Sequence, residues 1–397
     1  MAVPRIDDIQ RRARLVTRHR LVPEHRAADP CAVADAVVAL HATDPATVHL
    51  AVAARSHDVG PGDVAAALYD DRSLVRTLAM RRTMFVVTRP LLPVLAASSS
   101  LAVAVTVRRT LVKDLAAAGV DPDPARWLAA TEEAAVTALA AAGEATGAEL
   151  SRMVPALATT LTYAEGKAYG GTVAITSRVL VLLGLEGRIV RGRPRGSWIS
   201  SQYRWATVER WLGAPIDAIS VDDARRLLVE RWLRSFGPGT VADLRWWTGW
   251  TAAAVKAALA GLAVADVALD GGGTALVLAD DLEPVVRPVP SAALLPALDP
   301  TTMGWKARSW YLGDHGPALF DTNGNAGPTV WWDGRIAGGW AQHPRGDVVV
   351  RLLDEVGREA GAAIEDEAAR LTAWIGPIRV IPRFRTPLER ELVAGPG

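Results

Sequence analysis

The sequence predicts an α+β fold in which helix pairs followed by β-hairpins recur along the chain. Three observations predict it. Apolar residues recur at helical spacing near the N-terminus and lead into an alternating run rich in Val and Thr at 73–88. The same order of patterns returns at 148–205 and again at 221–280. Residues 286–397 differ, because they carry hairpin signals and end in a closing helix.

Length and composition favour a soluble protein of several domains. The chain has 397 residues, of which 50% are apolar, and a formal net charge of +1. Its one cysteine, Cys31, excludes a disulfide framework and a cysteine-based zinc ribbon. The first residues are charged where a secretory signal needs an apolar run. The apolar stretch at 91–107 is short for a membrane span and contains Pro93. We therefore expect a cytoplasmic protein that has no membrane partner.

The charges are segregated along the chain, so the small net charge hides local excesses. Residues 72–109 contain seven arginines and no acidic residue, and residues 176–205 contain six arginines and one acid. Acidic residues dominate 264–299 and 354–367. Much of the arginine content is typical of a GC-rich genome, but arginine is also the side chain that best binds phosphate and base edges. The pattern predicts a basic face on a neutral protein.

The N-terminal segment has the outline of a winged helix. Asp29-Pro30 is a plausible cap and first turn, and Gly60-Pro61 starts a later helix. Two short basic strands then follow within 73–88. Helices are expected at 7–20, 30–40 and 46–55, and from residue 61. Residues 90–145 are expected to be helical as well.

A second unit is expected at 148–205. Helices at 148–159 and 172–185, joined through 163–166, precede a strand, loop and strand at 188–200. The hairpin loop is cationic, which is what a wing lying along DNA phosphates requires. The alternative is a solvated basic loop on an ordinary hairpin. The candidate DNA contacts of this unit are Arg178, Arg191, Arg193 and Arg195.

The third unit repeats the pattern with different chemistry. A helix at 222–235 is followed by helices capped by Thr240 and Thr251, and then by a hairpin around Gly271–Gly273. The second of the capped helices carries only Lys256 as a basic residue. We interpret this unit as mainly architectural.

The C-terminal region is expected to be β-rich. Asp333-Gly334 between two apolar runs is a strong type I′ hairpin signal. A strand at 348–353 and an acidic helix at 354–374 follow, and the tail closes the chain.

The full prediction is three tandem winged-helix units plus a C-terminal β-rich domain with a closing helix. The expected domains are a first winged helix with a candidate catalytic turn (1–110), a helical connector (111–146), a second winged helix with a basic wing (147–215), a third winged helix (216–285) and the β-rich domain (286–397).

Three sequence phrases resemble the AlkZ/YcaQ-type winged-helix DNA glycosylases: LRSFGPGTVADLRWWTG (233–249), LLPALDPTTMGWKARSWYL (294–312) and VWWDGRIAGGW (330–340). The resemblance covers nearly the whole chain and implies tandem winged helices around a concave surface that binds double-stranded DNA. It implies a monofunctional glycosylase that excises alkylated or bulky purines, in base excision repair or in self-resistance to a genotoxin. No metal or organic cofactor is expected. The absence of a heptad repeat or an obvious dimerisation helix favours a monomer.

This chain departs from the family's catalytic signature, which is Gln-Φ-Gln or Gln-Φ-Asp with Φ aliphatic. His41-Ala42-Thr43 stands at the triplet, and Asp44 follows one residue later. His41 and Asp44 are the candidate pair that positions water, with Thr43 in support. A near-neutral His41 would also accept the proton. The alternatives are structural: Asp44 as a helix N-cap before proline, His41 as a buried histidine and Thr43 as a purely structural residue.

Arginines from the first unit, Arg76, Arg81 and Arg82, are expected to hold DNA beside this turn. The altered triplet keeps another function open, namely a DNA-binding protein without catalysis, either a transcription regulator or a damage sensor. A scaffold that binds a small metabolite is a weaker option. His41 and His49 are eight residues apart and drift off a shared helix face, so we expect no metal site.

Fourteen tryptophans are many for this length, and several lie near predicted packing seams. Core packing is the favoured interpretation, and stacking on an extruded base is the alternative. The clustered ones are Trp246, Trp247, Trp250, Trp331 and Trp332.

Overall fold

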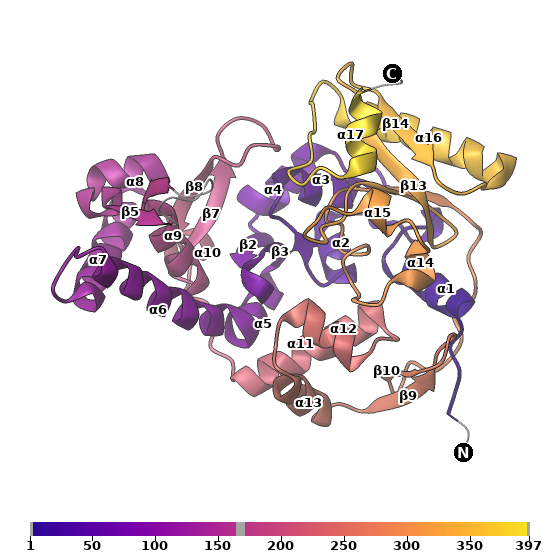
Figure 1. Cartoon of the computed structure of the whole chain (residues 1–397), viewed down its shortest axis with the longest axis horizontal. Helices are drawn as coiled ribbons and strands as arrows, with labels where there is room; N and C mark the ends of the chain where they lie inside the picture. Colours follow the sequence, from indigo (N-terminus) through magenta and orange to yellow (C-terminus); the bar gives the residue numbers. More distant parts are fainter. Residues whose placement is uncertain (1–2, 164–170, 395–397) are drawn as a thin grey trace.

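The computed structural model describes residues 3–163 and 171–394 of the chain. Within that range the strands form five small antiparallel sheets, and helices pack around them. Residues 101–163 and 171–212 gather at one end of the molecule and the C-terminal region lies at the other (Figure 1). The mixture of helices and strands confirms the predicted α+β class.

The N-terminal unit contains four helices and a three-stranded sheet. Its helices are α1 (Asp8–Arg18), α2 (Pro30–Ala36), α3 (Pro45–Ala53) and α4 (Pro61–Tyr69), and its strands are β1 (Leu40–His41), β2 (Leu74–Leu78) and β3 (Met84–Thr88). From α2 onward the order is helix, strand, helix, helix, strand, strand, with β3 between β1 and β2. Asp29 and Asp44 cap α2 and α3 by accepting a backbone N–H, and a proline follows each of them.

Helices connect this unit to the next one. They are α5 (Leu92–Leu95), a π-helical turn (Ala96–Ser100), α6 (Leu101–Ala117) and α7 (Pro124–Ala142). The continuous run Arg89–Ala117 is long and apolar enough to cross a membrane on composition alone, yet half of its most apolar window is buried inside the protein. Because α5 and the π-helical turn pack on a helix of the third unit and α6 packs on α7, the run serves here as a core helix.

The second unit repeats the order of the first, with an inserted hairpin. After α7 come β4 (Ala145–Thr146), α8 (Gly147–Met153), the inserted strands β5 (Thr160–Tyr163) and β6 (Gly171–Ala174), α9 (Thr176–Leu185), β7 (Ile189–Pro194), β8 (Tyr203–Thr207) and α10 (Val208–Leu212). The sheet order is β4-β8-β7, which matches the arrangement of the first sheet.

Two predicted elements of this unit are wrong. The helix expected at 172–185 begins only at Thr176, because Gly171–Ala174 pairs with β5, where the hydroxyls of Thr162 and Thr172 lie 2.9 Å apart. The second hairpin strand, expected to end at residue 200, begins instead at Tyr203. The loop before it leaves the sheet because Trp198 packs on aromatic rings outside the unit. From residue 164 onward, the predicted connection at 163–166 lies outside the described residues.

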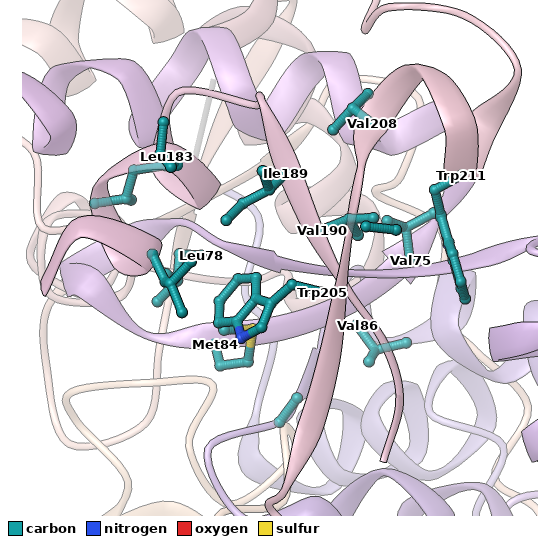
Figure 2. Packing of buried hydrophobic residues seen from close by; sticks show 14 of the residues in the cluster. Val75, Leu78, Met84, Val86, Leu183, Ile189, Val190, Trp205, Val208 and Trp211 are labelled. Atoms are coloured by element: carbon teal, nitrogen blue, oxygen red, sulfur yellow. The ribbon is translucent and has the colours of Figure 1, made fainter. Parts of the chain in front are cut away.

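The first two sheets share one hydrophobic core. Figure 2 shows Val75 and Met84 of the first sheet beside Val190 and Trp205 of the second, all of them buried. Burying one such side chain contributes about 1.5–3 kcal/mol. A core assembled from both units therefore holds them in a fixed relation, which also fixes the surface between them.

The third unit packs against α1, and the ring of its Phe236 meets the ring of His19, directly after α1, edge-on at a centroid distance of 4.6 Å. It comprises α11 (Val221–Phe236), α12 (Val241–Thr248), α13 (Ala252–Ala260), β9 (Val264–Ala268) and β10 (Thr274–Leu278). An isolated bridge between Gly239 and Leu276 stands where the first strand of the other two units lies. Thr240 and Thr251 cap α12 and α13, which confirms the caps predicted from the sequence.

The C-terminal region is built on a four-stranded sheet of order β11-β12-β13-β14. Its elements are β11 (Ala292–Leu295), α14 (Ser309–Leu312), α15 (Gly316–Leu319), β12 (Thr329–Trp332), β13 (Arg335–Gln342), β14 (Val348–Leu352), α16 (Gly357–Ile375) and α17 (Pro387–Ala394). Asp333 and Gly334 both have positive φ, as a type I′ turn requires. Helix α17, which packs on β13, was not predicted from the sequence.

A buried ion pair attaches this region to the first unit. The guanidinium of Arg55 lies 2.6 Å from the carboxylate of Asp299, and both side chains are fully buried. Separating the two parts at this point would leave each charge without its partner, so the pair fixes how they meet. The turn after β1 therefore has a fixed neighbour in the C-terminal region.

Candidate functional site: a cation-lined turn between three parts of the chain

The turn from His41 to Asp44 joins β1 to α3 and contacts the C-terminal tail (residues 377–387). The Asp44 carboxylate is 7% exposed and caps α3, with Oδ1 accepting the Ala46 N–H at 3.0 Å. Its Oδ2 accepts the backbone N–H of Arg383 at 2.8 Å. The cap alternative is thus confirmed. The same carboxylate is also bound to a residue 339 positions away.

His41 is buried in the sheet and does not have the near-neutral pKa that the sequence analysis assumed. It is 8% exposed, its ring meets Phe85 edge-on, and its Nδ1 accepts the Thr43 N–H at 3.5 Å. Burial, aided by the charge of Arg81, lowers the pKa of His41 to about 3. The imidazole is therefore neutral at pH 7 and too weak a base to take a proton from water. It still offers hydrogen bonds.

Arginines that lack carboxylate partners lie on one side of the turn. Arg81 and Arg82 join β2 to β3 and both adopt positive φ, a strained conformation for residues other than glycine. The guanidinium carbon of Arg81 lies 4.5 Å from the centroid of the Trp246 ring, and that of Arg308 lies 5.1 Å from the same centroid. In the described part of the chain none of these three guanidinium groups forms an ion pair.

A second set of arginines lies on the other side of the turn, next to Tyr203. Arg191 stacks on Tyr203 at 5.3 Å, and Arg76, which is 4% exposed, lies 5.0 Å from the same ring. Arg383 adds a charge close enough to lower the pKa of Arg191, although burial is the larger cause. Burial also raises the pKa of Tyr203, and the nearby Asp44 carboxylate adds to the increase. Arg81, near His41, and Arg383, bound to Asp44 and Thr43, are thus the arginines that lie next to the turn itself.

The other predicted arginines are already paired. Arg178 lies 2.5 Å from Asp114, and Arg193 lies 2.7 Å from Asp70. Arg195 pairs with Glu149. Exposed pairs of this kind contribute only about 0–1 kcal/mol, so an incoming phosphate can replace the carboxylate at little cost.

Sequence reasoning missed Arg308, Arg383 and Tyr203. Each reaches the turn only through tertiary contacts, so no spacing in the sequence connects them to residues 41–44. The one signal available was the basic tail PRFRTP, which the sequence analysis noted only as a terminal segment. Trp246 is half-buried between arginines rather than in the core, whereas Trp247 and Trp331 are buried as predicted.

Chemically, the arrangement offers one carboxylate, one neutral imidazole and one hydroxyl beneath two groups of uncompensated guanidinium charges. Buried cations without partners favour a polyanionic ligand. Among the described residues, no group of three or more His, Cys, Asp or Glu side chains is arranged to hold a metal ion.

Comparison with known proteins gives a consistent result. The profile of the family described as "DNA glycosylase AlkZ-like" matches residues 34–374. No curated protein matches the sequence at a significant level. Among solved structures, the DNA glycosylase AlkZ from Streptomyces sahachiroi is similar to this chain with a TM-score of 0.72 at 21% sequence identity, and the match covers 93% of this chain and 97% of that one. At this identity the structural likeness shows a shared fold.

Proposed function

The chain belongs to the AlkZ-like DNA glycosylase family, and on that premise we propose that it is a monofunctional glycosylase for alkylated or bulky purines in double-stranded DNA. The observation that carries the proposal is the position of Asp44. This carboxylate accepts the backbone N–H of Arg383, whose guanidinium has no carboxylate partner among the described residues, and Arg81 lies close to His41 at the other end of the turn. DNA phosphates would supply the missing negative charge and would bring a target nucleotide to the turn.

The proposed chemistry uses water and the residues of the turn. Alkylation at N7 makes a purine cationic, so the bond between C1′ and N9 breaks with the electron pair leaving on the base. Asp44 stabilises the oxocarbenium-like sugar and accepts the proton of the attacking water as its oxygen bonds to C1′. Thr43 and neutral His41 orient that water through hydrogen bonds. The products are the free neutral purine and an abasic site.

The three repeated units supply the DNA-binding surface in this proposal. Each contains two helices followed by a hairpin, with β5 and β6 inserted between the two helices of the second unit, and in the first two units a third strand lies next to the hairpin. We assign them as winged helices, with β7–β8 as the basic wing. Arg82 and Arg191 would contact phosphates on the two sides of the turn. A role in base excision repair or in genotoxin resistance follows from the reaction class.

A second function, DNA binding without catalysis, is favoured by one observation. His41 and Thr43 stand at the first and third positions of the Gln-Φ-Gln or Gln-Φ-Asp signature that the resemblance implies, and His41 is too weak a base to replace a catalytic carboxylate. A damage sensor would need the same cationic surface but no water activation.

The two functions differ in one measurable product. Duplex DNA containing N7-methylguanine is incubated with the protein, and abasic sites are detected by alkaline cleavage. The proposal expects cleavage with the wild type and at least about a hundredfold less with Asp44→Asn, since oxyanion-type stabilisation is worth about 10²–10³ in rate. Asparagine also caps helices well, but its one carbonyl oxygen cannot accept both the Ala46 and the Arg383 N–H, so the unfolding transition of this variant is measured beside its activity.

The matched control is Asp29→Asn, which changes the equivalent cap of α2 away from the turn. It should leave excision unchanged. Tight, salt-dependent binding of the duplex without abasic sites would refute catalysis and leave the sensor.

A further inference from the structure

A cleft of about 620 Å³ lies between α8, α9, the β7–β8 hairpin and the C-terminal tail. These elements, apart from the tail, belong to the lobe around α8 and α9 in Figure 1. Arg191, Tyr203 and Arg383 are among its lining residues. The cleft reaches the candidate turn through Arg383, a lining residue whose backbone N–H binds Asp44 and whose guanidinium lies 3.5 Å from the Thr43 carbonyl oxygen.

The charge in the cleft is uncompensated. Within residues 3–163 and 171–394, neither Arg191 nor Arg383 has an acidic partner, and Arg195, at the edge of the cleft, has only Glu149. The guanidinium of Arg191 lies against the rings of Tyr203 and Trp205 at 5.3 and 5.1 Å. These contacts fix the position of the cation without neutralising it.

Buried polar groups in the wall of the cleft lack partners. Tyr203 is 7% exposed and its hydroxyl has no hydrogen-bond partner, and the Nε of Arg191 has none either. Behind the Tyr203 ring, the buried guanidinium of Arg76 adds a positive charge that has no ion-pair partner among the described residues. Each unsatisfied buried donor costs about 1–3 kcal/mol, and an unpaired buried cation costs more. Such groups are expected where a ligand supplies the acceptors.

The start of α9 adds donors at the opposite wall. Thr176 and Ser177 line the cleft in the first turn of this ten-residue helix, and no side chain caps it. Free N–H groups at a helix N-terminus favour an anion. The first turn of α9 thus lines the same cleft as Arg191 and Tyr203.

We propose that this cleft binds a phosphate group through Arg191 and Arg383, with the Tyr203 hydroxyl donating a hydrogen bond. Arg383 would then be shared between the bound phosphate and the Asp44 carboxylate, so that phosphate binding orders the tail segment that touches the turn. Only the identification of the phosphate with one in the DNA backbone rests on the proposed function. The site itself does not require glycosylase activity.

The first test uses inorganic phosphate and the full chain. Calorimetric titration and thermal melting are carried out in phosphate and in chloride at matched ionic strength. The wild type is expected to bind phosphate and to melt at a higher temperature in phosphate. Arg191→Met and Arg383→Met should each weaken phosphate binding about tenfold or more, since a hydrogen bond to a charged group is worth about 1.5–3 kcal/mol.

Two further variants make the test specific. Arg152→Met removes an exposed charge from α8 without touching the cleft lining, and it should bind phosphate like the wild type. Tyr203→Phe removes only the unpaired hydroxyl, so it should weaken binding without unfolding the protein. Absence of a phosphate-specific shift in the wild type, or equal weakening by Arg152→Met and Arg191→Met, would overturn the proposal.

A second experiment distinguishes the source of the phosphate. If phosphate competes with an undamaged duplex, and Arg191→Met weakens both interactions, the cleft holds a backbone phosphate of DNA. If phosphate binds without displacing the duplex, the site is confirmed for a free phosphorylated molecule, and its assignment to DNA fails. Neither arm depends on base excision, so failure of the glycosylase proposal is seen separately.

Discussion

Removing the Asp44 side chain should destabilise the protein more than removing an ordinary helix cap. Asp44→Ala deletes the N-cap of α3, which costs about 1 kcal/mol, and leaves the Arg383 N–H without its acceptor, which costs about 1–3 kcal/mol in a buried setting. The expected loss in the free energy of unfolding is therefore about 2–4 kcal/mol. Asp29→Ala deletes only the cap of α2 and should cost about 1 kcal/mol.

Equilibrium unfolding in urea, with linear extrapolation to water, measures both losses. The difference between the two variants isolates the bond between Asp44 and the tail. If the two alanine variants lose the same free energy, the contact between Asp44 and Arg383 contributes nothing. The view of the turn as a structural junction would then be wrong.

Two further predictions concern pH and salt. Burial, with help from neighbouring arginines, lowers the pKa values of His41 and His49 to about 3, so the unfolded state binds protons more readily below about pH 6.5. The free energy of unfolding should thus fall between about pH 6.5 and 3, and His49→Phe should flatten this dependence; an unaltered slope in that variant would contradict the assignment. Removing Arg191, Arg193 and Arg195 together should reduce the slope of log K against log salt for duplex binding by about one to three, and an unchanged slope would exclude them as phosphate contacts.

Elements that depend on local chemistry were predictable from the sequence. Aspartate before proline at Asp44 starts a helix wherever the chain places it, because the carboxylate accepts an N–H only two residues away. The caps at Thr240 and Thr251 and the turn at Asp333 follow the same logic. These signals need no information about distant residues.

Elements decided by tertiary packing were not predictable in this way. The apolar run before α9 fits a helix or a strand, and only its pairing with β5 selects the strand. The residues around Trp198 have the pattern of a β-strand. Their loop nevertheless leaves the hairpin, because the ring of Trp198 stacks on His49. At the candidate site, His41 and Asp44 could be named from the sequence. The low pKa of His41 could not be predicted, because it depends on burial by the sheet that β1 forms with β3. Arg383 was missed because its partner lies 339 residues earlier.

The most direct test of the central claim is single-turnover release of free N7-methylguanine from duplex DNA, with the base identified by mass spectrometry. The account predicts that the wild-type protein releases the base and that the rate constant falls at least about a hundredfold in Asp44→Asn. Asp29→Asn should retain the wild-type rate constant. Release at equal rates by the wild type and Asp44→Asn would remove Asp44 from the mechanism, and a duplex that is bound but never loses its base would contradict the glycosylase assignment itself.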